Sequence, residues 1–207
     1  MADLVPSEDE INRLHREKME RRQAARRKVL ATKTEERGLV IVHTGAGKGK
    51  STAAFGLALR MLGRGHRVGI VQFIKGAWHS AERDALAVFG DQISWHTMGE
   101  GFTWETQDLK RDIAAAERAW EKALELMRDP TFGLVILDEI NIALRYAYLD
   151  VHAVVTALNA RRTGLHIIVT GRNAKPELVA AADLVTEMTL VKHHFAAGVK
   201  AQPGIEF

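Results

Sequence analysis

The sequence predicts an α/β domain built on a mostly parallel β-sheet with helices on its faces. From Gly38 onward, short apolar runs of strand length alternate with segments of helical periodicity, which is the pattern of βαβ units. A turn rich in glycine and lysine follows the first run, and two acidic residues end a later one. Ligands bind at the carboxyl ends of the strands in such sheets, so we expect both features at one site.

The expected elements follow one another along this part of the chain. Apolar runs predict strands at residues 39–43, 67–74, 134–138 and 166–170, and an edge strand at residues 184–190. Apolar residues at helical spacing predict helices at residues 50–62, 80–89 and 107–127. Parallel strands joined by helices imply right-handed crossovers.

The first 37 residues differ in composition from the rest. We expect a basic, helical N-terminal arm over residues 1–37 and one α/β domain over residues 38–207. Eight Lys or Arg lie between Arg13 and Lys28, against two Glu. Such a run is typical of a solvated helix, or of a segment that folds over a phosphate-rich site or a partner subunit. Nucleic-acid binding is disfavoured, because no aromatic residue that could stack on bases lies among the charges.

Composition excludes several classes of protein. The chain has 207 residues and no cysteine, so neither disulfides nor thiolate chemistry is available to it. No apolar run approaches the roughly 20 residues of a membrane span, and the first ten residues are polar and acidic rather than of signal-peptide type. We therefore expect a cytoplasmic protein that does not interact with a membrane.

The turn after the first strand reads Thr-Gly-Ala-Gly-Lys-Gly-Lys-Ser over residues 44–51. Glycines between a strand and a helix let backbone N–H groups form an anion-binding nest, as in phosphate loops. Lys50 would bring a charge to phosphate oxygens, and Ser51 would bring an oxygen to Mg²⁺. Thr44 stands where the usual first glycine would be, so the loop is shorter than the standard one. The predicted ATP-binding residues here are Gly45, Ala46, Gly47, Lys48, Gly49, Lys50, Ser51 and Thr52.

A second signal is the apolar run at residues 134–137, which is followed by Asp138 and Glu139. Phosphate-loop proteins place an acid there to hold the metal, so Asp138 is the predicted partner of Ser51 in binding Mg²⁺ or Mn²⁺. The fold class is thus phosphate-loop NTPase-like, of recombinase-like type. A glutamate in the position of Glu139 orients water in many hydrolases, which leaves a recombinase-like ATPase as an alternative.

The segment at residues 99–107, Gly-Glu-Gly-Phe-Thr-Trp-Glu-Thr-Gln, carries two aromatic residues, Phe102 and Trp104. Taken alone, it is typical of a loop held to the core by its aromatics. Together with several other stretches, it resembles the ATP:corrinoid adenosyltransferases of vitamin B12 synthesis that are built on a phosphate-loop fold. The resembling stretches are residues 44–51, 71–75, 99–107, 137–148, 170–173, 192–193 and 197–207. The resemblance runs from about residue 32 to the last residue, and Ala46 departs from the Asn or Lys that is usual in the family.

The resemblance implies a reaction and roles for residues. Cobalt(I) of a reduced corrinoid attacks the 5′ carbon of ATP, which is bound in reverse relative to hydrolases, and the triphosphate leaves. Lys50 and Glu139 would act at the nucleotide and Arg172 would pair with phosphate, while Phe102 and Trp104 would face the corrin ring. Cobalt(I) carries no proton to remove, which agrees with the absence of a recognisable nucleophile–base set.

The same resemblance implies partners. Because the chain has no thiols, electrons for cobalt must come from an external reductant such as a reduced flavin or flavoprotein. The family also implies a homodimer in which the arm covers the neighbouring subunit's nucleotide site. His193 and His194 are expected to point apart and not to share a metal ion. A non-catalytic nucleotide-binding regulator remains a third alternative.

Overall fold

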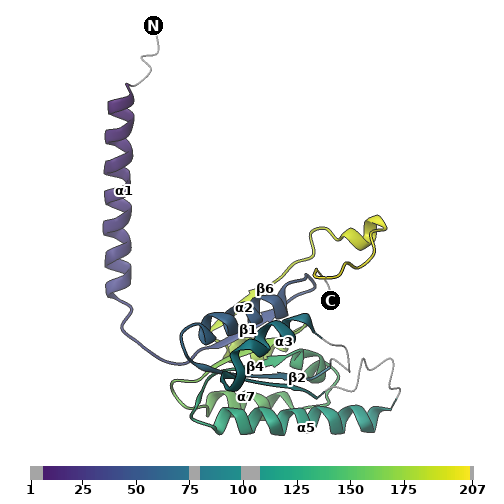
Figure 1. Ribbon diagram of the computed structural model, residues 1–207. Helices are drawn as coiled ribbons and strands as arrows, with labels where there is room; N and C mark the ends of the chain where they lie inside the picture. The colour runs from purple at the N-terminus through teal and green to yellow at the C-terminus, as the bar shows by residue number, and fades with distance from the viewer. Residues whose placement is uncertain (1–6, 75–79, 99–107, 206–207) are drawn as a thin grey trace. The chain divides into compact units, whose positions relative to one another are not determined.

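The computed structural model describes residues 7–74, 80–98 and 108–205, and it divides into two compact units, Met1–Glu36 and Arg37–Phe207. The first unit contains helix α1, Glu8–Ala31 (Figure 1). Ser7 caps it by accepting a hydrogen bond from the Glu10 N–H, and acidic residues in its first turn suit the helix dipole. All of α1 is described, and none of its residues is buried. The predicted basic helix is therefore confirmed.

The second unit is built around a parallel sheet. Among the described residues it has six strands in the order β3-β2-β4-β5-β1-β6, and every neighbouring pair is parallel. The strands are β1 (Val40–Thr44), β2 (Arg67–Gln72), β3 (Ile93–Thr97), β4 (Phe132–Asp138), β5 (His166–Thr170) and β6 (Leu184–Glu187). The inner strands are continuous apolar runs because helices cover both faces of the sheet. The predicted fold class is confirmed.

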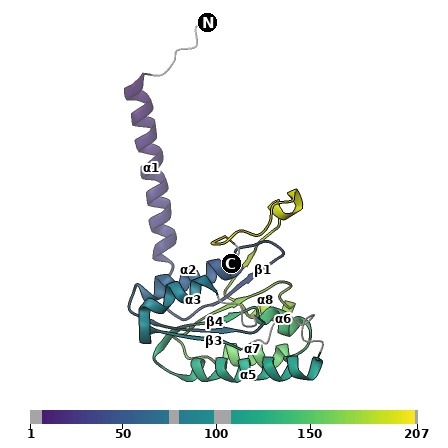
Figure 2. The same ribbon diagram turned by 45° about the vertical axis from the view of Figure 1, so that its right-hand side comes forward.

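The helices of this unit lie in two layers, as Figures 1 and 2 show. Helices α2 (Lys50–Leu62) and α3 (Ala81–Leu86) lie on one face, and α5 (Leu109–Arg128) and α7 (Val151–Asn159) lie on the other. The shorter elements are α6 (Ile140–Arg145), α8 (Pro176–Ala181) and the 3₁₀ helices η1 (Ala87–Gln92) and η2 (His194–Ala197). Two apolar clusters, one on each side of the sheet, form the core.

Two predicted strands are shorter in the structure. The edge strand expected at residues 184–190 ends at Glu187, which pairs with Thr44, the last residue of β1; Met188 then lies beside the phosphate loop that follows β1. There its N–H donates to the carbonyl of Thr44 at 2.8 Å, and its own carbonyl accepts from Gly47. The strand expected at residues 67–74 ends at Gln72, although Phe73 and Ile74 are also buried.

Strand β3 and helices α6, α7 and α8 were not among the predicted elements. In β3, Ile93-Ser94-Trp95-His96-Thr97, polar and apolar residues alternate and every residue is half-buried, so the strand lacks the apolar run that marks its neighbours. None of the helices that the structure describes is both long and apolar enough to cross a membrane.

Candidate active site

The phosphate loop joins β1 to α2 at the carboxyl end of the sheet. Gly45 and Gly49 have φ values of 97° and 101°, in the left-handed region where a side chain is strained. Gly49 stands at the N-cap of α2, so the helix begins at Lys50, the residue predicted to start it. The glycine spacing therefore produces the turn that the sequence predicted.

The segment after β6 lies directly against this loop. The N–H of Gly47 donates to the carbonyl of Met188 at 2.6 Å. A Cβ on Gly45 would lie 2.4 Å from that carbonyl oxygen, and a Cβ on Gly47 would lie 2.6 Å from the carbonyl oxygen of Thr189. These two glycines are thus required by packing against the neighbouring backbone, apart from any contact with phosphate.

The Lys50 side chain is folded back onto the loop. Its Nζ donates to the carbonyls of Gly45, at 3.0 Å, and Gly47, at 2.5 Å, and the residue is only 7% exposed. Burial lowers the pKa of Lys50, the Glu139 carboxylate opposes that shift, and the Arg172 charge adds to it. Glu139 and Arg172 therefore both act electrostatically on Lys50, although the three residues come from three different strand–helix connections.

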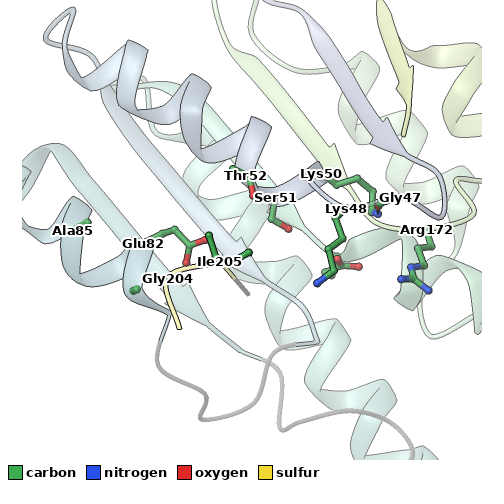
Figure 3. A pocket seen from close by; sticks show the side chains of 13 residues that line it. Gly47, Lys48, Lys50, Ser51, Thr52, Glu82, Ala85, Arg172, Gly204 and Ile205 are labelled. Atoms are coloured by element: carbon green, nitrogen blue, oxygen red, sulfur yellow. Dashed lines mark hydrogen bonds between the residues drawn. The ribbon is translucent and has the colours of Figure 1, made fainter. Parts of the chain in front are cut away.

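These groups border a cavity of about 660 Å³, a size that suits a nucleotide. Its lining consists of Gly47, Lys48, Gly49, Lys50, Ser51, Thr52, Ala81, Glu82, Ala85, Glu139, Arg172, Gly204 and Ile205. Figure 3 shows Lys48, Lys50 and Arg172 toward one end, Glu82 and Ile205 toward the other, and Ser51 between them. The arrangement offers cations to a polyphosphate at one end, and a partly apolar wall at the other.

Glu139 is held in place by a specific local geometry. Its backbone is left-handed, with φ 62°, and its N–H donates to the Thr170 Oγ1 at 2.9 Å. Gly171 lies so close that a Cβ there would be 2.8 Å from the Cβ of Asn141 and 3.2 Å from Oε2 of Glu139. A non-glycine residue with positive φ is uncommon and is often found at functional sites. The close approach explains why the turn at residues 170–173 contains glycine.

Asp138 differs from Glu139 in its surroundings. It is fully buried and does not line the cavity, and its two carboxylate oxygens accept hydrogen bonds from Thr170, at 2.8 Å, and Gln72, at 3.0 Å. In the described parts of the chain, no cluster of three or more His, Cys, Asp or Glu side chains could hold a metal ion by itself. The Ser51 hydroxyl and the Asp138 carboxylate are the hard oxygen donors that Mg²⁺ uses when phosphate and water supply its other ligands. Ser51 lines the cavity and Asp138 does not, so the residues present fit a metal that arrives with a polyphosphate and takes Ser51 as its direct protein ligand.

His43, in β1, is a buried residue that sequence reasoning did not single out. Its Nδ1 lies 3.3 Å from the carbonyl oxygen of Lys50, and burial lowers its pKa, which the contact with that carbonyl partly offsets. This contact connects the end of β1 to the first residue of α2, across the base of the phosphate loop. A residue before a glycine-rich turn gives no sequence signal for such a role.

Comparison with known proteins identifies the family. The family model described as ATP:corrinoid adenosyltransferase BtuR/CobO/CobP matches residues 36–207. The chain belongs to this family. The resemblance seen in the sequence is therefore confirmed.

Curated relatives agree with the family assignment. Two proteins named corrinoid adenosyltransferase are 53% identical, in Pseudomonas aeruginosa, and 55% identical, in a Sinorhizobium species. The first alignment covers 96% of this chain and 98% of the relative, and the second covers 98% and 95%. The corrinoid adenosyltransferase CobA of Salmonella typhimurium is 46% identical over 86% of this chain and 90% of its own length.

The structure of this adenosyltransferase-family chain brings together most of the predicted site residues. Lys48, Lys50, Ser51, Thr52, Glu139 and Arg172 line one cavity with Gly47 and Gly49, whereas Gly45, Ala46 and Asp138 do not line it. Phe102 and Trp104 lie outside the described residues. The expectation that His193 and His194 point apart was wrong, because their rings stack with centroids 4.7 Å apart.

Sequence reasoning did not assign Glu82, Ala81 and Ala85 of α3, or Gly204 and Ile205 of the C-terminal segment, to the site. Residues 204 and 205 belong to a stretch that carried the family resemblance, which was the available signal. Helix α3 carries no motif that marks it as part of a binding site. Its place in the cavity wall depends on how the chain folds and could not be read from its position in the sequence.

Proposed function

We propose that this protein transfers the 5′-deoxyadenosyl group of ATP to cobalt(I) of a corrinoid and releases triphosphate, as a step of adenosylcobalamin (vitamin B12) biosynthesis. Membership in the ATP:corrinoid adenosyltransferase family supports the reaction. One observation carries the assignment of residues. The cavity at the phosphate loop combines Lys48, Lys50 and Arg172 with Glu139.

In this mechanism the cationic end of the cavity holds the triphosphate. Backbone N–H groups at the start of α2 and the helix dipole favour negative charge there. Lys50 would turn from the loop carbonyls toward phosphate oxygens, and Arg172 would pair with the same group. Because the triphosphate is the leaving group, charge that these residues stabilise on it lowers the barrier to breaking the bond between carbon and oxygen.

The other end of the cavity would receive the nucleoside. Ala81, Ala85 and Ile205 offer apolar contacts there. Glu139, which acts electrostatically on Lys50, would meet the ribose or the metal. ATP bound in this orientation, with its triphosphate at the cationic end, presents its 5′ carbon, rather than its terminal phosphorus, to an incoming nucleophile. Catalysis is then mainly positioning together with stabilisation of the leaving group.

A divalent cation, Mg²⁺ or Mn²⁺, fits this site, with the Ser51 hydroxyl and the Asp138 carboxylate as its protein partners. When bound, it would neutralise part of the charge on the departing triphosphate. Asp138 is buried behind the cavity wall, so we propose that it acts by accepting hydrogen bonds from water on the metal.

The remaining roles concern partners. We propose that Phe102 and Trp104 form the surface that faces the corrin ring, and that a reduced flavin or flavoprotein supplies electrons to cobalt. We further propose a cytoplasmic homodimer in which the basic arm covers a neighbour's nucleotide site. The eight basic residues between Arg13 and Lys28 all lie on α1, so the helix can bring several positive charges to a phosphate-rich site.

Visible spectroscopy tests the proposed activity. The protein is mixed anaerobically with Mg²⁺, ATP and a chemically reduced corrinoid, and the spectrum is recorded before and after illumination. Formation of a carbon–cobalt bond predicts a spectral change that needs both ATP and protein and is reversed by light. A reduced corrinoid whose spectrum is unaffected by ATP and protein would contradict the proposal.

A further inference from the structure

A row of buried polar side chains crosses the sheet at the carboxyl ends of four adjacent strands. Thr170 of β5 donates to Oδ1 of Asp138 in β4 at 2.8 Å, and Gln72 of β2 donates through Nε2 to Oδ2 at 3.0 Å. The Oε1 of Gln72 in turn accepts from Trp95 Nε1, at 3.0 Å, and Thr97 Oγ1, at 3.1 Å, both in β3. Thr170 and Asp138 are fully buried and Gln72 is 2% exposed.

The chemistry of the neighbours fixes the Gln72 amide in one orientation. The indole N–H of Trp95 can only donate, so it must face the amide oxygen. The amide nitrogen then faces Asp138, whose carboxylate accepts. Reversing the amide would place donor against donor on the β3 side and acceptor against acceptor on the other. By fixing the Gln72 amide, strand β3 therefore ensures that the amide nitrogen donates a hydrogen bond to Asp138.

This donor also restricts the Asp138 side chain. One oxygen is held from the β5 side and the other from the β2 side, so the carboxylate cannot rotate without losing a buried hydrogen bond. The Thr170 hydroxyl is itself fixed, because it accepts from the Glu139 N–H at 2.9 Å. None of the residues in this row lines the cavity, and Gln72 carries no role in the proposed reaction.

We propose that Gln72 is a positioning residue for the metal site: it orients the Asp138 carboxylate toward a cation that enters with ATP. This inference rests on the proposed role of Asp138. Hydrogen-bonding partners outside the direct ligands of a metal change its affinity roughly 10- to 100-fold when they are substituted, and Gln72 would act in this way through Asp138. Gln72 is suited to this work because a neutral amide donates to the carboxylate without neutralising its charge.

The same residue is attached to the end of β3 through its main chain. The Gln72 carbonyl accepts from the Met98 N–H at 3.0 Å, and the Trp95 ring lies against Phe55 of α2, with centroids 5.0 Å apart. Gln72 is thus held by its own strand, by β3 and, through Trp95, by the helix that starts at the phosphate loop. A side chain so constrained can position its neighbour with little freedom to adjust.

The test compares ATP affinity with and without metal, measured by isothermal titration in Mg²⁺ and in EDTA. Gln72→Met keeps the length of the side chain but removes both polar ends. The measured quantity is the dissociation constant of ATP in EDTA divided by that in Mg²⁺. We expect Gln72→Met to lower this ratio about tenfold, because it weakens binding of ATP with Mg²⁺ and spares binding of ATP alone. Trp95→Phe keeps a ring against Phe55 and removes one of the two donors to the amide oxygen, leaving Thr97, so it should produce a smaller change of the same kind.

A matched control is His166→Phe, at the amino end of β5. His166 also accepts a hydrogen bond from the backbone, from the Leu39 N–H at 3.2 Å. It lies at the amino ends of the strands, away from the site, so the variant should leave the ratio unchanged. Equal weakening with and without Mg²⁺, or an unchanged ratio in Gln72→Met, would overturn the proposal. If Gln72→Met does not fold, the ratio in Trp95→Phe decides in the same way.

Adenosylation by the wild-type protein is measured in parallel. A wild-type protein that makes no adenosyl-corrinoid would contradict the proposed function, whereas the role of Gln72 is judged by the metal dependence of ATP binding alone. The two failures are therefore distinguishable.

Discussion

The N–H of Gly47 donates to the carbonyl of Met188 at 2.6 Å, so one amide of the phosphate loop is bound by the segment that follows β6. This contact joins residues far apart in sequence and holds the loop against the end of the edge strand. The loop is therefore shaped by its neighbours in the sheet as well as by its own glycines. Substitutions that disturb the contact should affect ATP binding even where they remove no phosphate contact.

Gly45→Ala and Gly49→Ala should differ in their cost. Both residues have φ near 100°, so alanine is strained at either position, by about 1–2 kcal/mol. At Gly45 the new Cβ would also lie 2.4 Å from the Met188 carbonyl oxygen, whereas at Gly49 the nearest atom is the Met188 sulfur at 3.5 Å. We expect Gly45→Ala to lose about 1–3 kcal/mol more than Gly49→Ala in the free energy of unfolding. Urea unfolding of both variants measures this, and equal losses would contradict the clash.

Lys50→Ala should weaken ATP binding by roughly ten- to a hundredfold, because a charge-assisted contact to phosphate in a partly shielded cavity is lost. Isothermal titration measures the affinity. Lys110→Ala removes an exposed cation of α5 outside the cavity and is the control. Unchanged affinity in Lys50→Ala would remove the basis for the assignment of the phosphate loop.

The sequence predicted the local parts of the site better than the distant ones. Helix α2 and strand β5 have the predicted bounds, because a glycine N-cap and a compact apolar run are signals contained within a few residues. The contact between Gly47 and Met188 could not be predicted, because it depends on which strand lies beside β1. The row from Thr170 to Trp95 depends on strand order in the same way, and its β3 end lies on a strand that the sequence did not reveal.

The stability of the protein should fall in mild acid. Burial lowers the pKa values of His43, His96 and His166 from their ordinary value. Below about pH 6.5 the unfolded chain takes up protons at these residues that the folded chain does not. The free energy of unfolding should therefore decrease as pH falls, and level off below the folded-state pKa values, with a slope of at most about 1.4 kcal/mol per pH unit for each histidine.

His43→Gln tests the contribution of His43 to this pH dependence. His43 is chosen because it is 5% exposed and contacts the carbonyl of Lys50 at the end of the phosphate loop. Urea unfolding at pH 7.5 and pH 5.5 should show a smaller loss of stability in the variant than in the wild type. An equal loss in both proteins would show that His43 does not contribute to the pH dependence.

Removal of residues 1–30 should leave a folded domain that binds ATP. The second unit begins at Arg37, whose guanidinium pairs with Asp183 at 2.6 Å, and Asp183 also accepts from the Val40 N–H at 2.8 Å. We expect the truncated protein to retain its melting temperature within a few degrees but to adenosylate corrinoid more slowly. Removal of residues 1–6 alone is the control. Full activity in the longer truncation would indicate that α1 is a solvated helix without a role in turnover.

The identity of the phosphate product tests the central claim most directly. A hydrolase activates water at the terminal phosphorus and releases ADP and phosphate, and it needs no corrinoid to do so. In the proposed reaction cobalt(I) attacks the 5′ carbon, so ATP alone should remain intact on this protein. Anion chromatography of a complete anaerobic reaction with Mg²⁺, ATP and reduced corrinoid should show intact triphosphate in equal amount to the light-sensitive adenosyl-corrinoid. Stoichiometric ADP without a light-sensitive corrinoid would contradict the proposed reaction and favour an ATPase that uses Asp138 and Glu139.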